Sequence, residues 1–147
     1  MSLEKDINQN KFRNNYQKAT INIIYTSNWL QEKVKDFLEP IGITPQQFNI
    51  LRILRGQSPL STLQIRERML DKMSDTSRLV ERLIKKGLLT KESCKADKRL
   101  VDVSITEKGL AVLILLDKDT AGLDNLIANL SNEEVLMLND LLDKLRG

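Results

Sequence analysis

The stretch between Pro59 and Gly109 constrains the fold more than any other part of the chain. Inside it, Met73 to Lys86 has the apolar spacing of an amphipathic helix, at about 100° per residue. The residues on the apolar face are Met73, Thr76, Leu79, Val80, Leu83 and Ile84. The residues on the opposite face are Ser74, Arg78, Glu81, Arg82 and Lys85. One face should therefore pack on a core, and the other, with its basic excess, has the shape and charge to enter a DNA major groove.

The ends of this helix also have recognisable signals. Ser74 is expected to cap the first turn by accepting from backbone N–H groups. Gly87 is expected to end the helix in a left-handed conformation, with Lys85 and Lys86 near the negative end of the helix dipole. A shorter helix that starts at Ser61 precedes it, so the pair reads as a helix-turn-helix.

Two strands are predicted to follow, from Leu88 to Cys94 and from Leu100 to Ile105. The second strand alternates apolar and polar residues, which is typical of a half-buried strand. The tip between them, Lys95-Ala96-Asp97-Lys98-Arg99, holds three cations. Two helices followed by a hairpin with a basic tip predict a winged helix-turn-helix.

This stretch resembles the MarR (multiple antibiotic resistance regulator) family of bacterial repressors. The matching residues are Ser74 to Leu89, the wing motif Asp97-Lys98-Arg99, and Ser104 to Gly109 at the start of the next helix. The resemblance implies a homodimer. It also implies that a small aromatic or phenolic ligand, bound between the dimerisation helices and the winged unit, weakens DNA binding. In the family's oxidant sensors the reactive cysteine lies in the N-terminal region, which has none here.

Long apolar helices are predicted on both sides of the winged unit. The first runs from about Lys11 to Leu38, after ten polar residues that we expect to fray. A second long helix, capped by Thr106, runs from about Glu107 to Asn129, and its segment Leu110–Leu116 is apolar all round, so we expect it to be buried on all sides. A capping box at Ser131–Glu134 opens the last helix. These helices either complete a monomeric bundle or, as we favour, form a dimer interface.

The fold class is therefore mainly α with a small antiparallel β-hairpin, a winged helix-turn-helix core flanked by long N- and C-terminal dimerisation helices. We expect a single domain over residues 1–147. Its DNA-binding core spans about 41–106, and its dimerisation helices span about 1–39 and 107–146. Within the core, Thr44-Pro45 should open a helix that Gly56 closes.

The net charge of +3 is unevenly distributed along the chain. Residues 61–99 hold eleven Lys or Arg against six Asp or Glu, whereas residues 100–147 hold four against nine. A solvated charged surface would be enough to explain these counts of charged residues. Because the positive charge coincides with the helix-turn-helix pattern, we favour a polyanion partner.

The composition argues against several kinds of chemistry. The chain has no histidine and one cysteine, which excludes a histidine triad, a histidine metal site and a structural zinc site, so we expect no enzyme, no metal and no cofactor. Cys94, between Lys91 and Lys95, could be a sensor thiol, but we interpret it as a bystander. No run is long enough for a membrane span and no signal peptide is visible, so we expect a cytoplasmic protein without membrane contact.

The resulting hypothesis is a homodimeric transcriptional regulator, a repressor that binds a pseudo-palindromic double-stranded DNA operator and is released by a small-molecule ligand. The expected DNA-binding residues are Ser61, Thr62, Ser74, Asp75, Ser77, Arg78, Arg82, Lys95, Asp97, Lys98 and Arg99. Trp29 and Tyr25 could line a ligand pocket, although an aromatic residue on a helix is more often part of the core. The alternative function is a winged-helix module that binds an acidic protein, but such a module does not need a wing with three cations.

Overall fold

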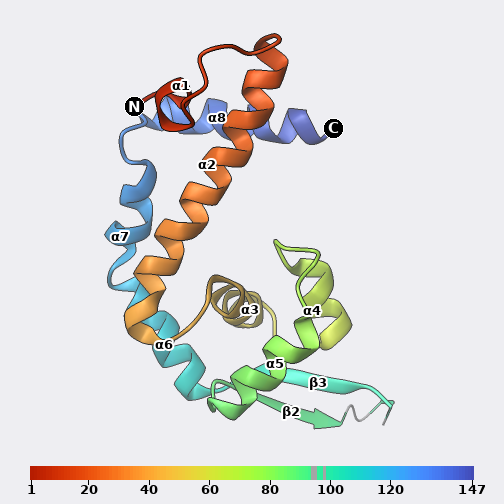
Figure 1. The fold of residues 1–147 in the computed structure, drawn as a ribbon. Coiled ribbons are helices and arrows are strands. Elements are labelled where there is room, and N and C mark those ends of the chain that lie inside the picture. Colours follow the sequence, from red (N-terminus) through yellow and green to blue (C-terminus); the bar gives the residue numbers. More distant parts are fainter. Residues whose placement is uncertain (94–95, 98) are drawn as a thin grey trace.

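The molecule has a winged unit at one end and a long helix that leads away from it (Figure 1). The computed structural model describes residues 1–93, 96–97 and 99–147. The long helix is α2 (Asn15–Leu38), and both chain termini lie near its far end. None of the described helices combines the length and the apolarity that a membrane span requires.

The N-terminal region differs from the prediction in two ways. Helix α2 begins at Asn15 rather than near Lys11, because the Asn14 side chain accepts from the backbone N–H of Gln17 and so caps it there. The first ten residues, which were predicted to fray, contain a short helix α1 (Leu3–Asp6) with Leu3 buried. An ion pair from Lys18 to Glu4 holds α1 against α2.

The winged unit consists of helices η1 (Glu39–Ile41), α3 (Pro45–Gly56), α4 (Thr62–Arg68) and α5 (Thr76–Lys85) with strands β1 (Leu60–Ser61), β2 (Leu89–Ser93) and β3 (Val101–Ile105). The predicted helix start at Thr44-Pro45 is confirmed, and the helix predicted to start at Ser61 begins at Thr62 with Ser61 as its cap. Each forms a capping box, in which the hydroxyl accepts from the third helical N–H and a glutamine side chain there accepts from the cap N–H.

The described strands form one antiparallel sheet in the order β1-β3-β2. The predicted hairpin is confirmed as β2 and β3, with Leu89 opposite Ile105. Strand β1 was not predicted. It has only two residues and pairs Leu60 with Val103, so it is too short to show the alternation that marks a strand in sequence.

The core lies where α3, α4 and α5 cover the sheet. Leu38 from α2 and two leucines from α6 also reach it. Its largest fully buried side chains are Leu38, Ile50, Leu51, Leu54, Ile65, Leu83, Leu113 and Val103. The winged unit therefore builds its own core, and the flanking helices contribute to it only near their junctions with the unit.

The helix predicted from Glu107 to Asn129 is wrong in its length. The chain forms α6 (Glu107–Asp117), α7 (Thr120–Asp124) and η2 (Asn125–Ile127), and α8 (Asn132–Arg146) follows after the predicted capping box at Ser131. Gly122 lies so close to Phe37 of α2 that an added Cβ would come within 2.6 Å of the ring. The break in the helix therefore lets α7 pack closely on α2.

Full burial of the segment Leu110–Leu116 is also wrong. Leu113 and Leu116 are buried, but Ile114 and Leu115 of α6 are exposed. On the buried side, Gly109 makes a close approach: a Cβ there would lie 2.4 Å from the Leu88 carbonyl oxygen and 2.7 Å from Cγ1 of Ile105. The start of α6 is therefore packed directly against the sheet.

Candidate nucleic-acid interface

Helix α5 presents a polar face to solvent and an apolar face to the core, as predicted. Val80 and Leu83 are buried, whereas Ser77, Arg78 and Arg82 are exposed. The assignment of Met73 to the apolar face is wrong. Met73 precedes the helix and is 93% exposed, because α5 begins only at Thr76.

The cap of α5 is Asp75 rather than the predicted Ser74. The Asp75 carboxylate accepts from the backbone N–H of Arg78 at 3.2 Å, and an acidic group is favoured at the positive end of a helix. The Ser74 hydroxyl donates instead to the carbonyl oxygen of Asp71 at 2.8 Å. Ser74 thus shapes the turn before the helix.

The other end of α5 is fixed to the turn between η1 and α3. Gly87 adopts the predicted left-handed conformation, with φ at 75°. Gly42, in the turn between η1 and α3, is also left-handed, with φ at 77°. The Lys86 ammonium group donates to the Gly42 carbonyl oxygen at 2.5 Å and to the Gln47 side-chain oxygen at 3.3 Å. Lys108 of α6 donates to the Lys86 carbonyl oxygen at 2.9 Å. These contacts set the position of the helix relative to α3 and α6.

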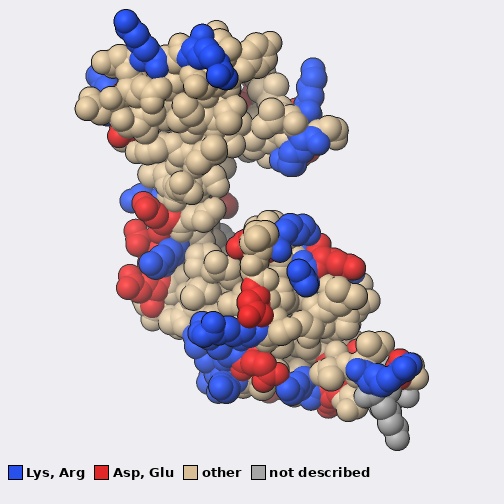
Figure 2. Space-filling view, turned by 45° about the vertical axis from the view of Figure 1, so that its right-hand side comes forward, with Lys and Arg blue, Asp and Glu red and all other residues tan. Residues whose placement is uncertain are grey.

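Basic side chains gather at the end of the molecule that carries α5 and the wing, with acidic side chains among them (Figure 2). Glu81 is the acidic residue on the outer face of α5, and its carboxylate is paired with Lys91 of β2 at 2.6 Å. The charge of Glu81 is thereby largely compensated, so Arg78, Arg82 and Lys85 determine the sign of that face.

A cleft of about 440 Å³ lies between the first turns of α4 and α5. Its lining residues are Thr62, Leu63, Arg66, Ser74, Asp75, Thr76 and Ser77. The structure therefore brings four of the predicted DNA-binding residues together. Arg66 was not predicted, although it lies one helical turn after Thr62 and so shares its face. Thr76 is 3% exposed, and within the described part of the chain its hydroxyl has no hydrogen-bond partner.

The described part of the wing tip holds an ion pair. The Arg99 guanidinium donates to both carboxylate oxygens of Asp97, at 3.2 and 3.3 Å, while the Arg99 side chain remains 90% exposed. The Arg99 side chain, followed by its backbone N–H, lowers the pKa of Asp97. The predicted contacts of Lys95 and Lys98 and the interpretation of Cys94 concern positions outside the described residues.

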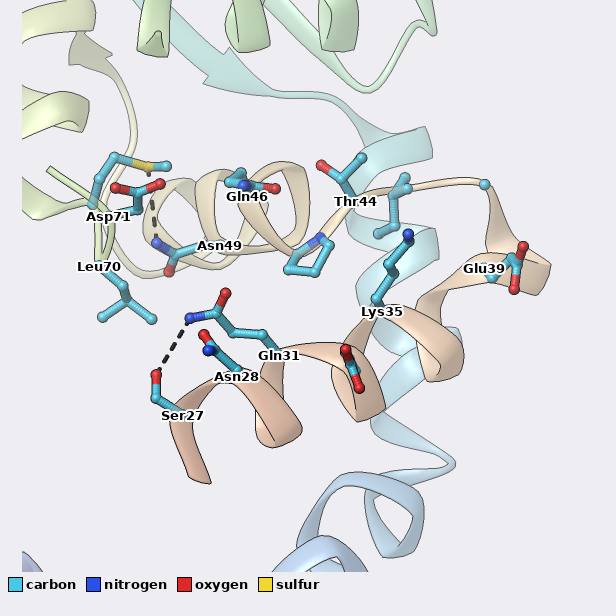
Figure 3. A pocket seen from close by; sticks show the side chains of 15 residues that line it. Ser27, Asn28, Gln31, Lys35, Glu39, Thr44, Gln46, Asn49, Leu70 and Asp71 are labelled. Atoms are coloured by element: carbon cyan, nitrogen blue, oxygen red, sulfur yellow. Dashed lines mark hydrogen bonds between the residues drawn. The ribbon is translucent and has the colours of Figure 1, made fainter. Parts of the chain in front are cut away.

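A second, larger depression of about 1160 Å³ runs between α2 and α3 (Figure 3). We call it the interhelix groove. It lies between the long helix and the winged unit, where the predicted ligand pocket was expected. Its α2 wall is built from Ser27, Asn28, Gln31, Glu32 and Lys35. The aromatic residues Trp29 and Tyr25, which were considered as pocket residues, do not line this groove.

The model for the MarR family matches residues 41–100. The HTH-type transcriptional regulator MhqR of Bacillus subtilis (strain 168) is 33% identical over 106 residues, which cover 70% of this chain and 72% of MhqR. This relative is similar over most of its length.

Two solved structures share the fold. A mutant MarR from E. coli complexed with operator DNA superposes with a TM-score of 0.82 at 23% identity, covering 92% of this chain and 99% of that one. The organohalide-sensing transcriptional regulator RdhR-CbdbA1625 in its 2,4-dichlorophenol-bound form gives a TM-score of 0.81 at 20% identity, covering 94% and 85%. From the sequence match and the shared winged-helix architecture, we conclude that the chain belongs to the MarR family of transcriptional regulators.

Proposed function

We propose that this protein is a homodimeric, sequence-specific DNA-binding transcriptional regulator, a repressor that a small-molecule ligand releases from its operator. The observation that carries the proposal is the outer face of α5, where Ser77, Arg78 and Arg82 are exposed on a helix whose other face is buried. A helix held this way can enter the major groove while its own domain keeps it rigid.

Each predicted residue receives a role in this proposal. Ser77, Arg78 and Arg82, with Ser74 and Asp75 at the start of α5, face the base edges. The N-terminus of α4 at Ser61 and Thr62 contacts phosphates, as does the first turn of α3 after Thr44, and Arg66 joins them from the cleft. Arg99, held by Asp97, enters the flanking minor groove, with Lys95 and Lys98 on phosphates.

Helix α8 supports the homodimer. Within the described residues, none of its fifteen side chains is buried. Its exposed apolar side chains are Leu136, Met137, Leu138, Leu141 and Leu145. An apolar stripe of this length left in water is unfavourable, and a second copy of the same helix is the simplest cover under two-fold symmetry. Ile23, Ile24 and Tyr25 on α2 extend the exposed apolar surface.

Two proteins of similar structure support the parts of the proposal that concern operator binding and ligand binding. The E. coli MarR structure contains operator DNA, and the RdhR structure contains a chlorinated phenol. In this chain the interhelix groove lies between α2 and the winged unit, so that an occupant would contact both. A ligand that binds only one arrangement of these parts shifts the protein towards that arrangement and changes its affinity for DNA.

A gel-shift and footprinting experiment on the DNA upstream of the protein's own gene tests the proposal. The expected footprint is a pseudo-palindrome with half-sites about 10–10.5 bp apart between centres. Arg82→Ala should weaken the complex strongly. Arg13→Ala, which removes an exposed cation just before the start of α2, serves as the matched control and should bind as the parent does.

Two results would contradict the proposal. A footprint with one asymmetric half-site would argue against the symmetric dimer on DNA. An affinity that does not change between low and high salt would argue against phosphate contacts, because neutralised phosphates release counterions on binding. The second result would favour the alternative, a module that binds an acidic protein.

A further inference from the structure

The interhelix groove has three walls. One is α2, the second is the turn from η1 into α3, and the third is the segment after α4 (Figure 3). Apolar residues form part of its floor, since Ile43 and Met69 line it and are buried, and Leu70 and Pro45 line it as well. The groove therefore offers an apolar surface to the body of a ligand.

The charged lining of this groove has a negative excess. Three carboxylates line it, from Glu32, Glu39 and Asp71, against the single ammonium group of Lys35. No ion pair involving these four side chains occurs in the described part of the chain. The field inside the groove thus favours a positively charged occupant and opposes an anion.

A buried carboxamide supplies an independent observation. Asn49 of α3 lines the groove and is only 7% exposed. Among the described residues, its side chain makes one hydrogen bond, from its amide nitrogen to the Met69 sulfur at 3.8 Å, and sulfur is a weak acceptor. Its carbonyl oxygen accepts from no protein donor in the part of the chain that the structure describes. Figure 3 shows Asn49 on the side of the groove that faces Gln31 and Asn28 of α2. Of the described buried side-chain polar atoms, Thr76 Oγ1 is the one without a partner, so the Asn49 oxygen is accessible from the groove and can accept an N–H or O–H group of a ligand.

We infer that the interhelix groove binds a small amphiphilic cation, an apolar or aromatic body that carries a protonated amine or amidine. The body lies on Ile43, Met69 and Leu70. The cationic N–H groups donate to the Asn49 oxygen and to the carboxylates of the lining. The inference rests on the proposed function in one respect only, since it names the class of ligand that would regulate the DNA complex.

Two residues that line the groove also form hydrogen bonds with the segments at the two ends of α5. On the N-terminal side, Asp71 lines the groove while its carboxylate accepts from the backbone N–H of Met73 at 2.9 Å and its carbonyl accepts from Ser74. On the C-terminal side, the Gly42 carbonyl of the groove wall accepts from Lys86. An occupant that draws the Asp71 carboxylate towards the groove competes with the turn that precedes α5, which gives ligand binding a direct route to the DNA-facing helix.

The test uses two small phenols of similar size and opposite charge. Tyramine carries an ammonium group and 4-hydroxyphenylacetate carries a carboxylate, so the phenol is common to both and the charge is the variable. Isothermal titration calorimetry on the full chain without DNA should show tyramine binding at least about tenfold more tightly, which corresponds to about 1.4 kcal/mol. Equal affinities, tighter binding of the carboxylate, or no binding of tyramine at 10 mM would each overturn the inference.

Variants locate the effect in the groove. The double variant Glu32→Gln with Glu39→Gln removes two lining charges and should reduce the tyramine preference to about threefold or less. Asp36→Asn is the matched control, because Asp36 is an exposed carboxylate of α2 outside the groove lining, and it should keep the tenfold preference. If Asp36→Asn reduces the preference as much as the double variant does, the net charge of the protein rather than the groove selects the cation.

A gel shift on the same samples separates this inference from the proposed function. Tyramine should weaken the DNA complex of the parent at concentrations that saturate the groove, and 4-hydroxyphenylacetate should not. If no DNA fragment is bound at all, the proposed function fails, while the calorimetric preference still decides the ligand class. If DNA is bound and tyramine is not, the function stands and the inference fails.

Discussion

The winged unit and the terminal helix α8 differ in how far their apolar side chains are buried. In the winged unit, leucine and isoleucine side chains from α3, α4 and α5 close a core over the sheet, and Leu51 and Leu83 are completely buried. In α8, four leucines at comparable helical spacing, Leu136, Leu138, Leu141 and Leu145, are at least 40% exposed. Both regions show the amphipathic pattern in sequence, so the pattern by itself does not indicate whether the covering surface comes from the same chain.

This difference separates the region that determines folding stability from the region that determines dimer assembly. The core of the winged unit is closed within one chain, with Leu38 of α2 and Leu113 and Leu116 of α6, whereas the apolar stripe on α8 would be covered only by a second copy. Changes in the first region should therefore alter folding, and changes in the second should alter a concentration-dependent equilibrium.

The largest effect is expected from removing residues 132–147, which deletes α8. The truncated chain should become monomeric at micromolar concentrations in sedimentation experiments, because it loses a helix with five exposed apolar side chains and no buried residue. Its far-UV spectrum should still show the folded winged unit, since no residue of α8 belongs to the core. A truncated protein that remains fully dimeric would show that α2 and α6 suffice for pairing.

Leu83→Ala should lower the free energy of unfolding by about 2–5 kcal/mol, because it opens a cavity in a fully buried site. The loss should be the same at high and low protein concentration in urea titrations. Leu141→Ala on α8 is the matched control, and its effect should grow as the protein is diluted. The comparison fails if the two variants show the same concentration dependence.

Within the winged unit, Arg78→Ala should relax the choice of base inside each half-site. A bidentate contact from an arginine to guanine discriminates by about 1–3 kcal/mol, and Arg78 lies on the exposed face in the first turn of α5. Selection of bound sequences from a random DNA pool measures the effect. Unchanged base preferences would place Arg78 on a phosphate.

Arg99→Ala should weaken binding to most sites by a similar factor and reduce the slope of log affinity against log salt by about 1. The reason is that the proposed position of Arg99 is the minor groove, where an arginine reads groove width and A·T content rather than individual bases. The same selection experiment should show weaker preference for A·T-rich flanks. If Arg99→Ala binds every site as tightly as the parent, the wing is not a DNA-binding element.

Thr76→Val should raise the free energy of unfolding by about 1 kcal/mol, because it replaces a buried hydroxyl without a partner among the described residues by a methyl group of similar size. Thr106→Val is the opposite case. The Thr106 hydroxyl donates to the Gly87 carbonyl at 2.7 Å and accepts from the Gly109 N–H, so its loss should destabilise the protein by a comparable amount. Thermal unfolding of both variants checks the signs.

The smallest effect concerns the pH dependence of the wing tip. The pKa of Asp97 is lowered by Arg99, so the folded state holds the ionised form more strongly than the unfolded chain does. The pairing therefore contributes fully above the unfolded pKa and is lost as the pH falls through the lowered folded pKa. NMR titration of the Asp97 carboxyl should show its midpoint moving upwards in Arg99→Ala, and an unchanged midpoint would contradict the pairing.

The features that the sequence predicts well are local. The caps at Thr44, Ser61, Thr106 and Ser131 and the left-handed Gly87 all depend on residues within one helical turn, and all are present. The order of helices and strands in the winged unit follows because each has its own apolar period. The exposed basic face of α5 was found for the same reason.

One missed feature, the cap of α5, depends on a choice between neighbouring residues, and the others depend on residues far away in the chain. Ser74 and Asp75 are both good caps, and the choice between them is decided by Asp71, whose carbonyl takes the Ser74 hydroxyl. The break after Asp117 reflects the packing of Gly122 on Phe37 of α2. The groove and its Asn49 side chain arise where α2 and α3 meet, and no periodicity within either helix reports on that junction.

The close approach at Gly109 has a consequence for the DNA site itself. Helix α6 leaves the sheet at this point and leads towards the helices that would pair two copies, so the contact with Leu88 and Ile105 fixes the direction of that arm. In a dimer, the contact at this glycine would therefore set the distance between the two α5 helices. A methyl group at position 109 would tilt the arm, and the operator that fits best would change in the spacing between its half-sites while each half-site kept its bases.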